Sequence, residues 1–115
     1  MISKNKYDYI ICGGGISGLL LSHALISDNF FDEKKVLLIE KDNKVNNDKT
    51  LSFWDNKKNI LDKIADKIWE NAEFRDTKFS NSFNLSPYKY KMVRSDRFYS
   101  FMKRKINKAA NFEYL

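Results

Sequence analysis

The spacing of apolar residues changes twice near the start of the chain. After a polar start at residues 1–6, which we expect to fray, Tyr7 to Cys12 forms a short β-favouring run. Ile16 to Ser27 then carries apolar residues over the length of a helix, and Val36 to Glu40 is an apolar run that ends in a carboxylate. The pattern predicts a strand, a helix and a second strand, and the right-handed crossover rule places the two strands side by side and parallel.

The middle of the chain has three further patterns. Lys41 to Asn59 is rich in Asn, Asp and Lys, which predicts a long loop. From Ile60 to Trp69 the apolar residues recur at i, i+1, i+4 and i+5, which predicts an amphipathic helix of about three turns with one packing face. Phe79 to Leu85 and Tyr88 to Val93 lie on either side of Pro87 and favour two strands, which we expect to pair in a small antiparallel insertion.

The last part of the chain predicts a helix and the beginning of a strand. Ser95 is a good N-cap, and a helix through about Lys108 would bury one apolar stripe, made of Phe98, Phe101, Met102 and Ile106. Phe112 to Leu115 resembles the first half of a third strand.

These elements together predict the α/β class. The fold is expected to be Rossmann-like and dinucleotide-binding, with an incomplete parallel sheet and a small antiparallel insertion. Such a domain needs several parallel strands covered on both faces, and only two strands are clear in this sequence. We therefore expect residues 1–115 to be the amino-terminal part of a longer protein.

The chemistry of the chain centres on a glycine turn between the first strand and the first helix. Gly13 permits the tight turn, Gly15 lets a backbone approach a pyrophosphate, and Gly18 allows the helix to pack closely on the sheet. The unpaired N–H groups of the helix start then form an anion site. Glu40 follows Gly18 by 22 residues, near the offset at which an acid accepts hydrogen bonds from a ribose hydroxyl and disfavours the 2′-phosphate of NADP. The candidate cofactor-binding residues are Gly13, Gly14, Gly15, Ser17, Gly18 and Glu40.

Two other interpretations of this stretch remain open. Tyr9 to Ile26 contains no charged residue over 18 positions and holds a Gly14-x-x-x-Gly18 spacing, as a membrane helix or signal sequence would. Against this, three adjacent glycines would weaken such a helix, and Glu40 at the end of a second strand would go unexplained. The other alternative is a phosphate-type loop that has lost its ligand.

The net charge of +6 comes from 17 lysines and only 4 arginines, beside 12 asparagines. Such a surplus is typical of compositional bias, and we expect no nucleic-acid partner, because a nucleic-acid site would cluster its charges and include more Arg. One local excess exists between Lys89 and Lys108, with eight basic residues against the single acid Asp96. This segment is either a solvated helix face or a site for a phosphate or an anionic membrane surface.

Cysteine and histidine add little chemistry. Cys12 is alone, which excludes a disulfide or thiolate cluster within the chain, and at the end of a strand it is expected to be a buried apolar filler. His23 is also alone in its helix, with no second ligand at metal-binding spacing, so no metal site is predicted. Low cysteine use and the lack of a convincing export signal predict a cytoplasmic location.

A group of aromatic residues lies within the predicted loop. Phe53 and Trp54 close the segment from Thr50 to Trp54, in an otherwise polar neighbourhood. A loop beyond the carboxyl ends of a parallel sheet is where open α/β folds bind ligands. The same residues would equally serve to anchor the loop on the core.

The order of these segments resembles the amino-terminal part of the flavoprotein lycopene cyclases. The resemblance includes the glycine unit, the strand ending at Glu40, and the last helix with Ser95 and Phe98 in a Ser-x-x-Phe start. Its discriminating part is Thr50 to Trp54, which is similar to the Thr-Trp-Ser-Phe segment of that family, with Leu51 in the Trp position.

This resemblance implies FAD as the cofactor, with NAD(P)H as a candidate electron donor, and a domain 1–115 that is part of an FAD-binding domain. It implies a full-length enzyme that cyclises lycopene to β-carotene without net redox change. Gly13, Gly15 and Gly18 would then lie at the pyrophosphate and Glu40 at the adenosine ribose. The acidic motif of the family lies downstream, so no catalytic residue is expected here and the fragment itself should be inactive. A lipophilic substrate also implies peripheral attachment to the inner face of a membrane.

Two other functions compete with this one. The first is an FAD-dependent oxidoreductase of the hydroxylase or geranylgeranyl-reductase type, in which Arg94 or Arg97 would contact the flavin. The second is a non-catalytic basic module that uses Lys89 to Lys108 to bind a membrane surface, which predicts salt-sensitive liposome binding without flavin.

Overall fold

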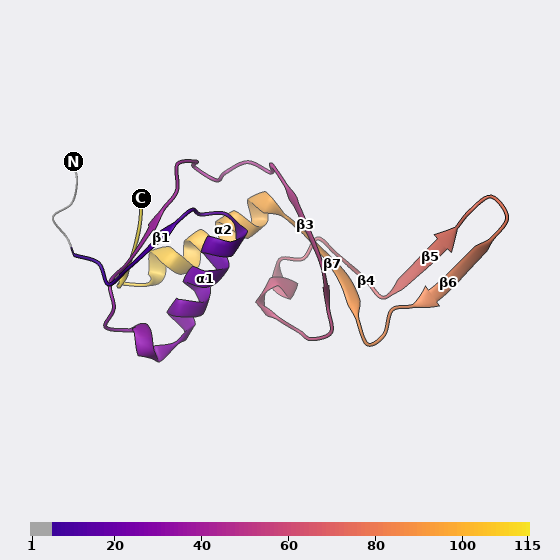
Figure 1. Cartoon of the computed structure of the whole chain (residues 1–115), viewed down its shortest axis with the longest axis horizontal. Helices are drawn as coiled ribbons and strands as arrows, with labels where there is room; N and C mark the ends of the chain where they lie inside the picture. Colours follow the sequence, from indigo (N-terminus) through magenta and orange to yellow (C-terminus); the bar gives the residue numbers. More distant parts are fainter. Residues whose placement is uncertain (1–5) are drawn as a thin grey trace. The chain divides into compact units, whose positions relative to one another are not determined.

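A computed structural model describes residues 6–115, so the predicted polar start lies almost wholly outside the described residues. The chain divides into two compact units, Met1–Val45 with Tyr99–Leu115, and Asn46–Phe98. The first unit holds a parallel sheet, and the second holds two antiparallel sheets. Figure 1 follows the elements in chain order by colour.

The first unit confirms the predicted strand, helix and strand. β1 (Tyr9–Cys12) leads through the glycine turn into α1 (Ile16–Ser27), and β2 (Val36–Ile39) pairs parallel with β1. A short 3₁₀ turn, η1 (Asn29–Phe31), follows α1. The third strand is also confirmed, because β8 (Phe112–Tyr114) pairs parallel with β2 and gives the order β1-β2-β8.

The two faces of this sheet differ in burial. Ile11, Leu38 and Tyr114 are register partners and share one face, on which Leu38 is fully buried. Both crossovers move in the same direction across the sheet, so right-handedness places both connecting helices on one face. It is the face of Ile11 and Tyr114, because Gly18 of α1 packs near Ile11 and Lys103 lies over the Tyr114 ring. The opposite face carries Ile10, 55% exposed, and Cys12, which is also exposed. The prediction that Cys12 is a buried filler is therefore wrong, because its side chain lies on the face that these helices leave open.

The last helix, α2 (Ser95–Lys108), begins and ends where the sequence predicts. Phe98, Met102 and Ile106 are buried as expected, and Tyr99 joins them at 1% exposure. Phe101, which was predicted in the same stripe, is only half-buried.

The second unit is built around a strand from within the predicted loop. β3 (Thr50–Asp55) pairs antiparallel with β7 (Lys89–Arg94) over six positions, and β4 (Lys67–Trp69) pairs with the other edge of β7. The prediction of a loop from Lys41 to Asn59 is therefore wrong over Thr50–Asp55. Thr, Phe and Trp fit a pleated surface, and alternate residues of β3 are half-buried and exposed, as in a strand with one covered face.

The predicted helix from Ile60 to Trp69 is also wrong. Only a 3₁₀ turn, η2 (Ile60–Lys63), forms there, with Asn59 and Asp62 as a capping box, and the chain then extends into β4. Asp66 donates its backbone N–H to Met92 at 2.9 Å, which commits this segment to pairing with β7. Pairing with a distant strand overrides the local helical spacing.

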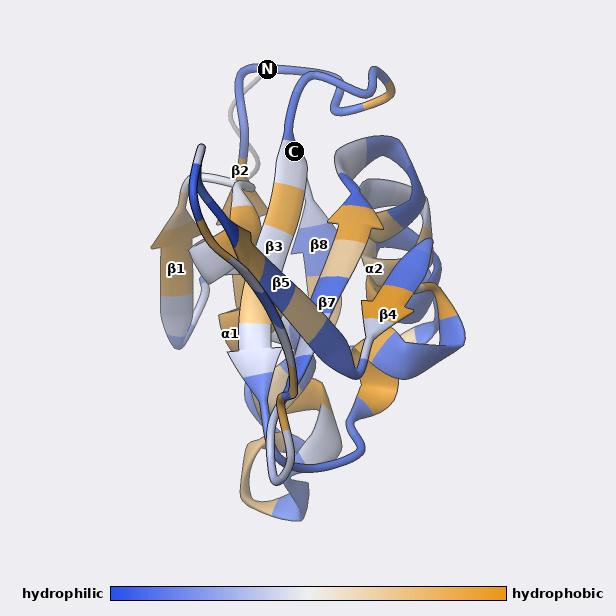
Figure 2. Cartoon of the chain, turned by 90° about the vertical axis from the view of Figure 1, so that its right-hand side faces the viewer, coloured by the Kyte–Doolittle hydropathy of each residue, from blue (hydrophilic) through white to orange (hydrophobic). Residues whose placement is uncertain are grey.

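The antiparallel insertion exists, but its predicted pairing is wrong. β6 (Ser80–Asn84) pairs with β5 (Asn71–Arg75), a strand that the sequence analysis did not identify, and not with β7. Along β5, bands of hydrophilic and hydrophobic residues alternate (Figure 2). Ala72, Phe74 and Phe83 share the apolar face of this hairpin, and Phe74 is 59% exposed.

Candidate functional site

The glycine turn joins β1 to α1 with three distinct backbone requirements. Gly13 has a φ of +110°, a conformation that residues with a Cβ rarely adopt. An ideal Cβ on Gly18 would lie 1.9 Å from the carbonyl oxygen of Gly13, so only glycine lets the helix approach this closely. Around Gly15, no atom of the described residues other than its two chain neighbours lies within 4 Å of the corresponding position. The turn is therefore closely packed where Gly18 of the helix meets Gly13, and open at Gly15.

The start of α1 is free to hold an anion. Gly15 is the N-cap and offers no side-chain hydrogen bond to the first turn, which also contains no acidic residue. The first N–H groups of a helix have no intrahelical partner, and the helix dipole favours negative charge there. Ser17 is exposed in this first turn. The open space at Gly15 and the uncapped helix start fit a phosphate group.

Glu40 lies directly beside this turn. Its Oε2 accepts a hydrogen bond from the backbone N–H of Gly14 at 2.6 Å, and its Oε1 accepts from the N–H of Asp42 at 2.9 Å. These bonds, led by the one from Asp42, lower the pKa of the Glu40 carboxyl below its ordinary value. A Cβ on Gly14 would lie 2.9 Å from Cβ of Glu40, so glycine is needed there as well. The structure thus brings together all six predicted residues, with Glu40 ionised at neutral pH.

One residue of this site was missed by sequence reasoning. The hydroxyl of Tyr114, on β8, lies 3.1 Å from the position that a Cβ on Gly14 would occupy. This oxygen is buried and has no hydrogen-bond partner among the described residues. Burial raises the pKa of the Tyr114 hydroxyl, and the negative charges of Glu40 and Asp42 raise it further. The sequence predicts the strand but gives no signal for the role of its tyrosine.

The loop after Glu40 is tied to α2. The ammonium group of Lys103 donates to the carbonyl oxygens of Asn43 and Lys44. The same ammonium group lies 5.5 Å from the centroid of the Tyr114 ring. Lys103 therefore covers the tyrosine and holds the loop that follows the acid.

The aromatic segment belongs to the second unit and forms a ladder across its sheet. Trp54, Tyr90 and Trp69 are cross-strand neighbours, with ring centroids 4.8 and 5.7 Å apart. Trp54 is 58% exposed, whereas Phe53 is half-buried. The ladder stabilises the sheet and leaves an aromatic surface open.

The two arginines singled out for a flavin contact both bind Asp66, Arg94 through its backbone and Arg97 through its guanidinium, while the Arg94 guanidinium pairs with Asp96. The backbone N–H of Arg94 donates to Oδ2 of Asp66 at 2.8 Å, and the guanidinium Nη1 of Arg97 donates to Oδ1 of Asp66 at 2.8 Å. The bond from the Arg94 backbone, followed by the contact with Arg97, lowers the pKa of Asp66. Asp66 thereby fixes the junction between β7 and α2.

No metal centre is formed by the described residues, since no three His, Cys, Asp or Glu side chains are grouped for one. Burial, followed by the charge of Lys105, lowers the pKa of His23. Within residues 6–115, no helix has the length and apolar character needed to cross a membrane. The alternative of one membrane helix over Tyr9 to Ile26 is wrong, because a strand and a turn occupy its first half.

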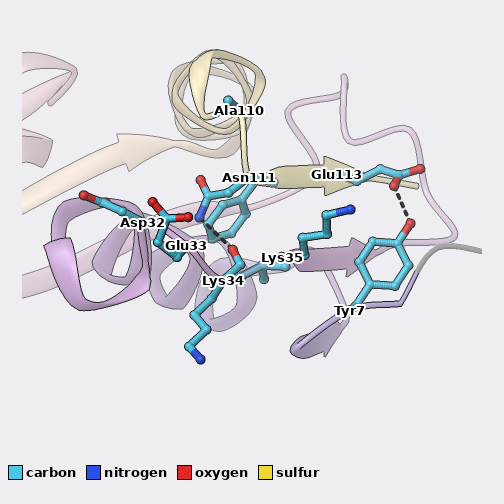
Figure 3. A pocket seen from close by; sticks show the side chains of 10 residues that line it. Tyr7, Asp32, Glu33, Lys34, Lys35, Ala110, Asn111 and Glu113 are labelled. Carbon is cyan, nitrogen blue, oxygen red and sulfur yellow. Dashed lines mark hydrogen bonds between the residues drawn. The ribbon is translucent and has the colours of Figure 1, made fainter.

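A hollow of about 600 Å³ lies beside the parallel sheet. Figure 3 shows Tyr7 and Glu113 joined by a hydrogen bond at one side of it, and Asn111 donating to the carbonyl of Lys34. Val36 and Phe112, which also line it, begin β2 and β8. The hollow therefore lies at the amino ends of the strands, away from the glycine turn, and its mixed charges suggest no particular ligand.

Comparison with solved structures shows the fold. The crystal structure of a probable FAD-dependent monooxygenase from Pseudomonas aeruginosa matches 96% of this chain with a TM-score of 0.75 and 17% identity. The chain covers 33% of that protein. The fold of this chain is therefore found within a larger solved protein.

Comparison of sequences finds one partial match to a curated protein and identifies the family. A UDP-galactopyranose mutase from Mycoplasma pneumoniae is 46% identical over 44 residues, which are 38% of this chain and 10% of the mutase. The sequence model described as "Lycopene cyclase protein" matches residues 8–114. That match spans nearly the whole chain and includes the glycine turn, Glu40 and Tyr114, so the chain belongs to the lycopene cyclase family.

Proposed function

We propose that this chain is the FAD-binding part of a lycopene cyclase that converts lycopene to β-carotene. The observation that carries the proposal is the turn at Gly13–Gly18, open at Gly15, with the ionised Glu40 beside it. Membership of the lycopene cyclase family supports the substrate and the reaction. Since the chain covers a third of the monooxygenase that it resembles, the activity of the whole protein is part of this proposal.

The residues of the turn supply binding and orientation. The backbone N–H groups at the start of α1 would hold the pyrophosphate of FAD without any side chain. Glu40 would accept a hydrogen bond from the adenosine ribose, and its charge would repel a 2′-phosphate at the same place. When bound, a reduced flavin supplies electrostatic stabilisation to a cationic end group of the substrate. NAD(P)H is proposed as the electron donor.

The proposal assigns no proton donor or acceptor to the described residues. Cyclisation without net redox change needs one proton added to the end-group double bond and one lost after ring closure. Lycopene is a lipophilic partner, so we propose peripheral contact with a membrane surface as its route of entry.

The test is pigment formation in bacteria that accumulate lycopene. Expression of the complete gene should replace lycopene with a cyclised carotenoid, and the purified protein should carry flavin absorbance. The same expression with Gly15→Val, which fills the open space, should leave lycopene unchanged. Lycopene that persists with well-expressed, flavin-loaded wild-type protein would contradict the cyclase assignment.

A second candidate is an FAD-dependent oxidoreductase of the hydroxylase or geranylgeranyl-reductase type. It is favoured by Arg97, which Asp66 holds at 2.8 Å in the first turn of α2. This function predicts consumption of NAD(P)H in proportion to product, whereas a cyclase needs reductant only to reduce the flavin. The ratio of NAD(P)H consumed to product formed distinguishes the two.

A further inference from the structure

The strongest unexplained feature is the buried hydroxyl of Tyr114 beside Glu40. Two groups approach the same side of Gly14: the Cβ of Glu40 lies 2.9 Å, and the Tyr114 hydroxyl 3.1 Å, from the position of an ideal Cβ there. The hydroxyl has no hydrogen-bond partner among the described residues. A buried donor without an acceptor is unfavourable, and groups of this kind are rare in folded proteins.

Glu40 has acceptor capacity to spare. An ionised carboxylate offers about four lone-pair sites. Two of them are used by the N–H groups of Gly14 and Asp42, at 2.6 and 2.9 Å. The raised pKa of Tyr114 keeps its hydroxyl protonated, and therefore a donor, at neutral pH. The pair thus consists of an acceptor with free sites and a donor without a partner.

We propose that Tyr114 is a positioning residue for Glu40: its hydroxyl donates to the Glu40 carboxylate when that carboxylate accepts from the ribose of a bound adenine nucleotide. This inference rests on the proposed nucleotide site. The ammonium of Lys103 lies over the tyrosine ring, 5.5 Å from its centre, so the ring is contacted on its face and the hydroxyl remains directed to the side of Gly14. Tyr114 therefore acts through Glu40, and a ligand need not reach its buried hydroxyl.

The first test uses ADP as the probe, because it carries the adenosine and pyrophosphate without the flavin. ADP is titrated calorimetrically into the full-length protein freed of flavin. Tyr114→Phe should weaken ADP binding about fivefold, as expected for one hydrogen bond. Tyr7→Phe is the matched control, because it removes a hydroxyl that bonds Glu113 in the hollow at the amino ends of the strands, and it should leave ADP affinity unchanged.

The second test shows whether Tyr114 acts through Glu40. In a Glu40→Ala background, Tyr114→Phe should cause no further loss, because residues that act as one unit are not additive. With 2′-deoxy-ADP, which lacks the 2′-hydroxyl of the ribose, Tyr114→Phe should likewise have little effect. A merely structural role would instead give the same fold loss in both backgrounds and with both nucleotides.

The outcomes separate this inference from the proposed function. Failure of wild-type protein to bind either ADP or FAD would overturn the nucleotide site itself and the inference with it. Wild-type binding with unchanged affinity in a folded Tyr114→Phe variant would overturn only the positioning role. Additive losses in the Glu40→Ala background would also overturn it.

Discussion

The two units of the chain differ in whether their polar groups have hydrogen-bond or ion-pair partners. In the second unit, Lys91 is only 2% exposed; its ammonium forms an ion pair with Asp62 at 2.7 Å and donates to the carbonyl of Lys57 and to Asp55 at 2.9 and 3.4 Å. Ser95 is likewise fully buried, with Asp48 and Lys49 as partners at 3.0 Å. In the first unit, the start of α1 has no side-chain cap, and the hydroxyl of Tyr114 has no hydrogen-bond partner within residues 6–115.

This difference suggests that the second unit serves as a scaffold and that the first unit holds a ligand site. A buried polar group that is fully paired adds rigidity and leaves nothing for a ligand. Groups left open at the carboxyl ends of parallel strands lie where α/β folds bind nucleotides. We therefore expect substitutions in the second unit to affect stability, and selected substitutions in the first unit to affect ligand affinity.

The largest effect is expected from Gly18→Ala. A methyl group there would lie 1.9 Å from the carbonyl oxygen of Gly13, so α1 must move away from β1. The free energy of unfolding should fall by about 3 kcal/mol, at the upper end for overpacking. Thermal unfolding of the full-length protein measures this. A melting temperature equal to that of the wild type would contradict the close contact.

The matched substitution is Gly15→Ala, at a position with open space and an ordinary φ of −76°. Ala at an N-cap is less favourable than Gly by roughly 0.5–1 kcal/mol, a loss small enough for the protein to stay folded. Flavin content and ADP affinity should nevertheless fall, because the methyl group occupies the space proposed for phosphate. Normal ADP affinity in this variant would mean that the phosphate binds elsewhere.

A large loss of stability without a loss of affinity is expected from Lys91→Met. Removing the ammonium leaves Asp55 and Asp62 without their cation. The cost should be about 2–3 kcal/mol, less than for a fully buried pair because both carboxylates are partly exposed. Denaturant titration measures it, and ADP affinity of the folded fraction should not change. Lys89→Met is the control, since its pair with Glu70 is exposed and worth little.

The pH dependence of Glu40 gives a smaller effect with a defined sign. Hydrogen bonds from Asp42 and Gly14 lower the pKa of Glu40 in the folded protein below its ordinary value of 4.5. A lowered folded-state pKa means that the stabilisation is present above pH 4.5 and is lost as the pH falls through the folded-state value. Glu40→Gln should flatten the acid side of a plot of unfolding free energy against pH. An identical acid limb in both proteins would rule out this contribution.

The smallest effect is expected from Trp54→Ala on the aromatic ladder. The indole is 58% exposed and lies 4.8 Å from the ring of Tyr90. Loss of this cross-strand pair should cost about 1 kcal/mol. Chemical denaturation would detect the change, and a neutral result would show that the ring does not stabilise the sheet.

The sequence predicts the first unit better than the second for a physical reason. From Tyr9 to Glu40, each element touches its neighbour in the chain, and the glycine spacing constrains the turn directly. In the second unit, β7 pairs with β3 and β4, which are far away in sequence, and this pairing reshapes the segment from Ile60 to Trp69. Local periodicity contains no information about such partners, so both the helix and the hairpin pairing were wrong there.

The same reasoning applies to the site. The residues from Gly13 to Gly18 and Glu40 were predicted because their spacing follows from the geometry of one strand, turn and helix unit. Tyr114 was not predicted, because its place beside Gly14 depends on a third strand that joins the sheet 100 residues later. The exposure of Cys12 was not predicted either, since it depends on which face of the sheet the connecting helices cover.

The most direct test of the nucleotide site is calorimetric titration of ADP and FAD into the full-length protein, with Gly15→Val and Glu40→Ala as variants. The account predicts one site per chain in the wild type, no measurable binding in the first variant, and weakened binding in the second, with all three proteins folded. Wild-type affinity in both variants, or no binding by folded wild-type protein, would contradict it.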